Sequence, residues 1–186
     1  GKAMKAFPFM RPVAGKSCLI VGGGEVALRK AEKLYLFGVR LFVCAPECAD
    51  FSAFGAKVLR EKYRPQLLEG IDLAVAATDD KALNARVAED CRARGIPVNS
   101  VDDVQNCDFF FPALISRGEV TIGISTGGAS PALAAVLREY LEKCLPEDLA
   151  EVAEQAEKLR GTMPSQDYKE RVRRLFAAAL QREGKH

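Results

Sequence analysis

The chain has 186 residues, of which 48% are hydrophobic and 28% are charged. This balance is typical of a globular protein with one main domain and a smaller appended region, and it excludes a disordered or fibrous chain. The formal net charge is only +2 and no long run of like charges occurs, so we expect no nucleic-acid partner and no electrostatic contact with a membrane.

The N-terminal segment shows no export or membrane signal. Residues 1–3 precede Met4, and we interpret them as residues added for expression. The apolar stretch that follows is interrupted by Pro8, Pro12 and Lys16, so it is too short for the hydrophobic part of a secretory signal. No later segment resembles a membrane span. We therefore expect a cytoplasmic protein without membrane contact.

Brief apolar runs alternate with helical patterns along residues 4–112. The first run, 18–21, ends at three glycines, and apolar residues then recur at helical spacing over 26–37. A second helix is expected to end at Gly95. Short apolar strands that alternate with helices are typical of βαβ units, which predicts a Rossmann-type parallel sheet. Further strands are expected at 41–44, 57–63, 72–77 and from 97 onward.

The pattern changes after this domain. Within residues 113–145 we expect one strand, 120–125, and a helix with Ser130 as N-cap and Pro131 as its first residue. Residues 146–186 carry an almost continuous helical signal. The predicted fold class is therefore α/β: an N-terminal Rossmann-type parallel sheet, then a small α+β region, then a C-terminal helical region. The last predicted helix carries an apolar stripe of Val172, Leu175, Phe176, Ala179 and Leu180.

The cysteines do not form a recognisable metal site. Cys18 and Cys44 lie within apolar runs, where a free thiol behaves as a small hydrophobic group. Cys44 and Cys48 are close in sequence, but the only histidine is the terminal His186, and a structural zinc site needs four ligands. We therefore expect no metal ligands in this chain.

Three glycines, Gly22, Gly23 and Gly24, follow the first predicted strand and open the first helix. With Ala27 they match the pattern G-x-G-x-x-A. In this pattern the first glycine makes a turn, the second lets the backbone approach a pyrophosphate, and the alanine lets the helix pack closely. Amide groups at the helix N-terminus suit an anion. The loop predicts binding of a nicotinamide dinucleotide; a tight turn with a purely structural role is the alternative.

The choice between NAD and NADP depends on the end of the second strand. Dinucleotide-binding proteins of the NAD type usually carry an acidic residue there, which accepts a hydrogen bond from the ribose. This chain has Cys44, Ala45 and Pro46 instead, and Glu47 is the first acid that follows. No arginine follows the strand directly to hold a 2′-phosphate, which favours NAD and leaves NADP open.

Three polar motifs follow predicted strands, at residues 77–80, 99–103 and 125–131. Each alone is an ordinary turn or helix cap. The carboxyl ends of the strands in an open α/β sheet form the edge where ligands bind. We therefore expect the three motifs to converge near the cofactor.

Together with residues 22–30 and the Cys-Asp-Phe sequence at 107–109, these motifs resemble the precorrin-2 dehydrogenase family, which provides the dehydrogenase module of siroheme synthase. The resemblance runs from about Phe7 to Pro146. Members of this family are NAD-dependent homodimers that oxidise precorrin-2 to sirohydrochlorin, and some also insert ferrous iron to give siroheme. The resemblance implies the same for this chain, with residues 113–145 as a dimerisation and substrate region. The chain is too short for the methyltransferase domain of trifunctional relatives, so we expect no methylation.

The resemblance also implies roles for individual residues. Asp102 matches the key carboxylate of the family, and Ser100 stands where many relatives carry valine. The implied substrate contacts are Asn99, Thr126, Gly127 and Gly128. The implied cofactor contacts are Gly22, Gly23, Gly24, Glu25, Val26, Pro46, Glu47, Thr78 and Asp79.

Asp102 is expected to accept a proton as a general base while a hydride passes to the nicotinamide, or to take pyrrole protons if iron is inserted. A turn carboxylate with no chemical role is the alternative. The substrate carries eight carboxylates, so the helix N-terminus after Gly128 is expected to bind them, and Arg117 and Arg138 either assist or are merely solvated. Iron insertion stays open, because ferrous iron favours histidine or carboxylate ligands and the single histidine is terminal.

Two other functions stay open. A non-catalytic module that senses NAD or binds a tetrapyrrole would use the same glycine loop, with Asp102 and Thr126 in structural roles. A docking module would use the C-terminal apolar stripe to bind a partner enzyme, although that stripe would equally pack on its own domain or on a second copy of the chain.

Overall fold

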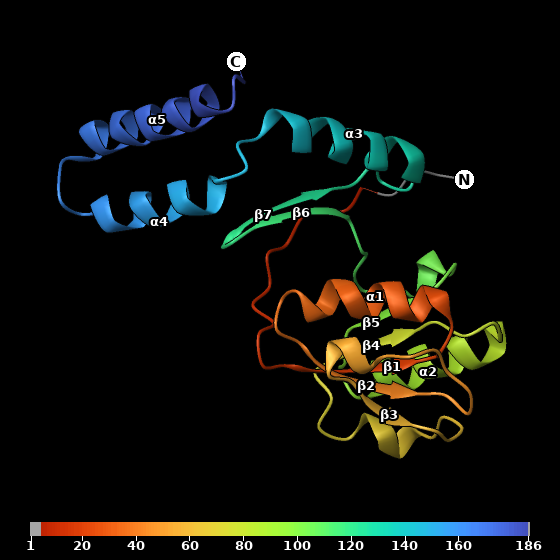
Figure 1. Cartoon of the computed structure of the whole chain (residues 1–186). Coiled ribbons are helices and arrows are strands. Elements are labelled where there is room, and N and C mark those ends of the chain that lie inside the picture. Colours follow the sequence, from red (N-terminus) through yellow and green to blue (C-terminus); the bar gives the residue numbers. More distant parts are fainter. Residues whose placement is uncertain (1–4, 186) are drawn as a thin grey trace. The chain divides into compact units, whose positions relative to one another are not determined.

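The computed structural model describes residues 5–185 of the chain (Figure 1). These form two compact units, one of residues 9–111 and the other of residues 112–185 with residues 5–8. Residues 1–3, interpreted as added for expression, lie outside the described residues together with Met4 and His186. No helix among the described residues combines the length and the apolar character needed to cross a membrane.

The unit of residues 9–111 is built on a five-stranded parallel sheet in the order β3-β2-β1-β4-β5. This is the Rossmann order, in which the chain reverses its direction of travel across the sheet between β1 and β4. The predicted α/β fold class is confirmed. The strands are β1 (Ser17–Val21), β2 (Arg40–Cys44), β3 (Lys57–Leu59), β4 (Leu73–Ala76) and β5 (Val98–Ser100).

One helix packs on each face of this sheet. Leu19 on β1 packs in one core with Val87, and its neighbour Ile20 packs in the other core with Ala27 and Ala31. Successive strand residues point to opposite faces, so the apolar residues of β1 are buried on both sides of the sheet. Ala27 is completely buried, which fits the predicted need for a small residue where the helix meets the sheet. The helices are α1 (Glu25–Tyr35), which carries Ala27 and Ala31, and α2 (Lys81–Ala93), which carries Val87.

The strand ends are aligned across four strands. Val21 lies opposite both Cys44 and Ala76, and Ala76 lies opposite Ser100. Because the strands are parallel, the segments that follow these four residues all leave the same edge of the sheet. The register therefore brings the glycine loop and the predicted motifs after β2, β4 and β5 to one edge.

The third strand is shorter than predicted. β3 ends at Leu59, and residues 60–63 form a loop instead of continuing the strand. Tyr63 is buried in this loop and donates a hydrogen bond from its hydroxyl to the Asp90 carboxylate at 2.7 Å. Three 3₁₀ segments were also not predicted: Ser52–Phe54, Pro65–Leu68 and Val104–Asn106.

The outer edge of β5 is closed by Cys107 and Asp108. The Asp108 amide donates to the Val98 carbonyl at 2.8 Å, and the Val98 amide donates to the Asp108 carboxylate at 3.0 Å. The Ser100 amide donates to the Cys107 sulfur at 3.2 Å. These bonds take the place of a sixth strand, so the Cys-Asp-Phe motif is part of the sheet edge.

The other unit begins with a hairpin of β6 (Ala113–Arg117) and β7 (Val120–Ile124), which form their own antiparallel sheet. Only one strand was predicted here, so the prediction missed β6. The expected N-cap is present, because the Ser130 hydroxyl accepts a hydrogen bond from the Leu133 amide at 3.0 Å. The helices of this unit are α3 (Pro131–Cys144), α4 (Leu149–Leu159) and α5 (Ser165–Arg182).

The C-terminal apolar stripe packs within its own unit. Ala179 of α5 is completely buried against Leu149 and Val152 of α4, and Leu175 and Phe176 pack on the same cluster. Three side chains of the predicted docking stripe, Leu175, Phe176 and Ala179, therefore join α5 to α4.

Candidate functional site

Gly22 lies at the point where the sheet order reverses, between the ends of β1 and β4. Its φ of +126° is unfavourable for any residue with a side chain. A Cβ atom on Gly22 would lie 2.2 Å from the Ala77 carbonyl oxygen. The glycine amide donates to the Cys44 carbonyl at 3.0 Å, which ties the loop to β2 as well. Only glycine fits at this position, between the end of β2 and the segment that follows β4.

Gly23 lies against the loop that follows β2. A Cβ atom there would lie 2.4 Å from the Cys48 Cβ atom and 2.6 Å from the Glu47 carbonyl oxygen. The Ala49 amide donates to the Gly23 carbonyl at 2.8 Å. The segment that carries Pro46 and Glu47 is therefore fixed directly beside the glycine loop, and both side chains are exposed.

Gly24 has no protein atom within 4 Å of the position of a Cβ atom, and its backbone is extended (φ −88°, ψ −168°), which any residue adopts. It is the N-cap of α1, and no side chain caps the helix here. The next two residues, Glu25 and Val26, are exposed. The first amides of α1 thus lack a side-chain acceptor, which leaves them available to an anion.

A buried amide holds the segment after β4. Asn84 on α2 accepts hydrogen bonds from the Thr78 amide (3.1 Å) and hydroxyl (2.7 Å) and donates one to the Thr78 carbonyl (2.9 Å). Thr78 is half-buried and Asp79 is exposed. Asn84 was not predicted as a site residue, although a polar residue on the apolar stripe of Val87 and Cys91 was the available signal.

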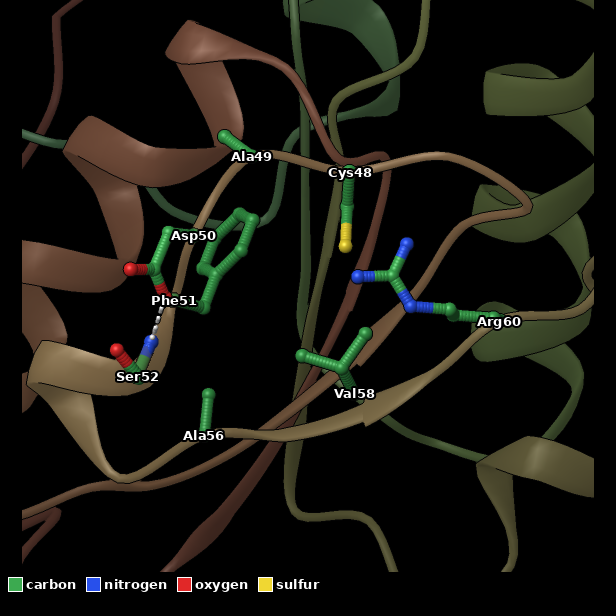
Figure 2. Close-up of a pocket in the computed structure, with 8 residues that line it drawn as sticks. All are labelled: Cys48, Ala49, Asp50, Phe51, Ser52, Ala56, Val58 and Arg60. Carbon is green, nitrogen blue, oxygen red and sulfur yellow. Dashed lines mark hydrogen bonds between the residues drawn. The ribbon is translucent and has the colours of Figure 1, made fainter.

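A cavity of about 340 Å³ adjoins the segment after β2 (Figure 2). Cys48, which touches the glycine loop, lines it together with Arg60, whose guanidinium points toward Cys48 in Figure 2. Asp50 also lines it, and hydrogen bonds from Ser52 hold the pKa of its carboxyl below the ordinary value. The prediction considered only arginines directly after the second strand, so it missed Arg60, which reaches this place from the end of β3.

Asp102 has an unusual backbone. Its φ is +56°, the one positive value at a non-glycine residue in the described part of the chain. Aspartate tolerates this left-handed conformation better than most residues, but such conformations persist only where neighbouring contacts impose them. The Val101 amide donates to the Ala76 carbonyl at 2.9 Å, and the Asp103 amide donates to the Ser100 carbonyl at 3.3 Å. Asp102 is exposed between these two fixed points.

Lys30 of α1 faces the same loop. Its ammonium lies 4.1 Å from the centroid of the Phe111 ring, a cation–π contact. Burial lowers the pKa of Lys30, as does Lys33, whereas Cys107 and Asp102 act to raise it. The ammonium is thus within electrostatic reach of Asp102. Lys30 belongs to the motif of residues 22–30 but was not predicted as a site residue. No neighbouring residue in the sequence distinguishes it from a solvated lysine on a helix.

Asn99 on β5 is 5% exposed, and its amide group is only half used. Its Nδ2 donates to the Phe109 carbonyl at 3.0 Å, while its Oδ1 has no hydrogen-bond partner among the described residues. A buried amide oxygen without a partner is costly to the fold.

The motif at residues 125–131 belongs to the other unit. It follows β7, which belongs to a separate two-stranded sheet, so it does not leave the same sheet edge as the other two motifs. The Thr126 hydroxyl accepts from the Ser130 amide and donates to the Ser130 carbonyl, both at 3.0 Å. Gly127 and Gly128 have φ values of +64° and +82°, and together these features form a turn that leads into α3.

The two arginines suggested as substrate contacts, Arg117 and Arg138, already have partners within this unit. Arg138 pairs with Glu142 on α3 at 3.1 Å, and Arg117 donates to the Ser116 carbonyl at 3.0 Å. No cluster of three or more histidine, cysteine, aspartate or glutamate side chains suited to a metal ion occurs in residues 5–185.

Known proteins resemble the chain along most of its length. Residues 9–113 match a family described as NAD(P)-binding, and residues 117–143 match one described as sirohaem biosynthesis protein central. Siroheme synthase of Methylococcus capsulatus is 42% identical over 93% of the chain, and that of Photorhabdus laumondii is 40% identical over 93%. The chain spans only 38% of the length of each of these relatives.

A solved structure resembles nearly the whole fold. It is that of SirC, precorrin-2 dehydrogenase, with a TM-score of 0.76 and 27% identity, covering 91% of this chain and 89% of that one. The NAD(P)-binding match spans more than half of the chain and coincides with the parallel-sheet unit, and the second match covers most of β7 and α3. The chain therefore belongs to the NAD(P)-binding family, and its second match is to the sirohaem biosynthesis protein central family. This confirms the predicted resemblance to the dehydrogenase module of siroheme synthase.

Proposed function

We propose that this protein oxidises precorrin-2 to sirohydrochlorin with NAD, in siroheme biosynthesis. The observation that carries the proposal is the similarity to SirC, precorrin-2 dehydrogenase, which extends over 91% of this chain and 89% of that protein. The glycine loop at the reversal point of the sheet supports the cofactor class, because Gly24 leaves room for a pyrophosphate against open helix amides.

The residues present fit a dinucleotide. The cradle of Gly22, Gly23 and Gly24 leaves the N-terminus of α1 accessible, and the segments at Glu47 and Thr78 flank it on either side. When bound, the nicotinamide ring supplies the hydride acceptor that no side chain can provide. The protein's own task is then to orient the two reactants and to accept a proton.

Asp102 is the residue we propose for that proton transfer. Its carboxylate is exposed at the ligand-binding edge of the sheet, and its left-handed backbone (φ +56°) is fixed by hydrogen bonds of the residues on both sides. Asn99 precedes it by three residues and offers an unpartnered acceptor to a pyrrole N–H or to a carboxamide. In the other unit we assign carboxylate binding to the turn of Thr126, Gly127 and Gly128, which leads into the N-terminus of α3.

We propose NAD as the preferred cofactor. Glu47 lies on the segment that touches Gly23, and no arginine directly follows β2. Arg60, on the cavity beside Cys48, is the specific observation in favour of NADP. Comparing kcat/KM for the two cofactors decides the point, and a higher value with NADP would overturn the preference for NAD.

We propose that the chain forms a homodimer through α3. Four large apolar side chains of this helix, Leu133, Val136, Leu137 and Tyr140, are between 38% and 64% exposed. They recur at the spacing of one helical face, and exposed apolar faces of this kind commonly mark interfaces. The occupant we propose is a second copy of the same face, since a two-fold axis pairs a surface with itself.

Val136→Glu is expected to weaken this dimer, because it places a charge in the centre of an apolar interface. The dimer dissociation constant should rise by about 30-fold or more, which corresponds to about 2 kcal/mol. Analytical ultracentrifugation measures it. Glu154→Lys on the exposed side of α4 is the control and should leave the constant unchanged. A wild-type chain that sediments as a monomer would refute the dimer.

The activity itself is tested by mixing the protein with precorrin-2 and NAD under anaerobic conditions. We expect sirohydrochlorin and NADH to form together in equal amounts. Tight NAD binding without any NADH would support a sensing module instead and would end the dehydrogenase proposal. The same assay with ferrous ion tests iron as a second substrate.

We propose the cytoplasm as the location, since all six cysteines are free thiols, as expected in a reducing compartment.

A further inference from the structure

The Cys107 side chain makes more polar contacts than its position in a loop requires. Its sulfur accepts a hydrogen bond from the Ser100 amide at 3.2 Å and lies 3.1 Å from the Ser100 carbonyl oxygen and 3.4 Å from the Asp103 carbonyl oxygen. The Asn99 Nδ2 atom also donates to this sulfur, at 3.7 Å. A single thiol therefore contacts the backbone on both sides of Asp102.

These contacts surround the strained residue. Ser100 ends β5 and is fixed by pairing with Ala76, while Asp103 begins the turn that leads to the 3₁₀ segment Val104–Asn106. Asp102 lies between them with φ +56°. A left-handed residue other than glycine is kept only when its surroundings determine it. The bonds through Cys107 connect the two ends of the short segment that contains it.

The thiol is suited to this role. It has one hydrogen to donate to a carbonyl and lone pairs to accept the Ser100 amide. Burial raises the pKa of Cys107, although the Ser100 hydrogen bond and Lys30 act in the opposite direction. The group consequently stays protonated near neutral pH and keeps its donor. A serine offers the same donor and acceptor on a shorter bond, whereas an alanine offers neither.

We propose that Cys107 is a positioning residue that holds the Asp102 carboxylate in its reactive orientation. The inference rests on the proposed function, because it assigns Cys107 a role through Asp102 and not through contact with the substrate. It predicts that loss of the thiol affects the chemical step more than it affects cofactor binding or the stability of the fold.

The experiment compares Cys107→Ala and Cys107→Ser with the wild-type chain. Three quantities are measured: the melting temperature, the dissociation constant of NAD, and kcat for NADH formation from precorrin-2. Misplacing a catalytic group by about 1 Å costs about 100-fold in rate. We therefore expect Cys107→Ala to lower kcat by about 10- to 100-fold with NAD affinity within about twofold of wild type, and Cys107→Ser to recover part of the loss.

The control is Cys91→Ala, which removes a completely buried thiol from α2, in the core on one face of the sheet. It should lower the melting temperature without lowering kcat. The double variant of Cys107→Ala with Asp102→Asn adds a test, because a residue that acts only through Asp102 should cause no further loss once that carboxylate is absent.

The outcomes separate the two proposals. No NADH from the wild-type chain defeats the proposed function itself. If the wild type is active, equal losses of kcat and NAD affinity in Cys107→Ser, or multiplicative losses in the double variant, would show a general structural role and overturn the positioning role. Should Cys107→Ala fail to fold, Cys107→Ser and its double variant with Asp102→Asn carry the same test.

Discussion

Asp102→Asn is expected to lower kcat for precorrin-2 oxidation by about 100-fold or more, since general-base catalysis typically contributes about 10²- to 10⁴-fold. Asparagine has nearly the same shape as aspartate and tolerates the left-handed conformation equally well. The variant thus keeps the turn and loses only the charge and the basic oxygen. A purely structural Asp102 would tolerate this change, whereas a proton acceptor would not.

The measurement is initial-rate kinetics together with NAD titration and thermal unfolding. The melting temperature and the dissociation constant of NAD should stay close to the wild-type values. Asp103→Asn is a useful comparison, because it changes a neighbouring carboxylate in the same turn. Wild-type turnover by Asp102→Asn would end the catalytic assignment.

Gly22→Ala and Gly24→Ala are expected to fail for different reasons. At Gly22 the new methyl group would meet the Ala77 carbonyl, and φ is +126°. We expect a loss of about 3 kcal/mol or more in stability and a melting temperature lower by about 10 °C or more. At Gly24 the backbone suits alanine and no protein atom is near, so the fold should be unaffected.

Gly24→Ala should nevertheless raise the dissociation constant of NAD by about tenfold or more, which is about 1.4 kcal/mol. The physical reason is that a methyl group there occupies the space through which a pyrophosphate approaches the helix amides. Calorimetric titration with NAD measures it. Gly95→Ala is the control for glycine replacement outside the loop: it has open space around it but a φ of +67°, so it should lower stability and leave the NAD affinity unchanged. Unchanged NAD affinity in Gly24→Ala would mean that this glycine does not face the cofactor.

Local signals explain what the sequence could predict. The apolar runs of β1, β2 and β4 are short and are bounded by turn or polar residues. The three consecutive glycines after Val21 predict a loop that binds a dinucleotide. The start of α3 could also be predicted, because serine is preferred at the N-cap of a helix and proline at its first position. Each of these features depends on neighbours along the chain.

What could not be predicted depends on contacts between distant segments. β6 is a strand because it pairs with β7. Its sequence, Ala-Leu-Ile-Ser-Arg, does not by itself predict a strand. The end of β3 depends on Tyr63 turning into the core. Asn84, Cys107 and Arg60 gain their significance only when α2, the β5 edge and the segment after β2 are brought together.

The closure of β5 by Cys107 and Asp108 has a consequence for the behaviour of the protein in concentrated solution. An outer strand normally offers free amides and carbonyls that another polypeptide can join, which is a common start of aggregation. Here the chain's own side chains and backbone occupy those groups at Val98 and Ser100. The opposite outer strand, β3, is only three residues long. The sheet consequently presents little template for self-association on either side.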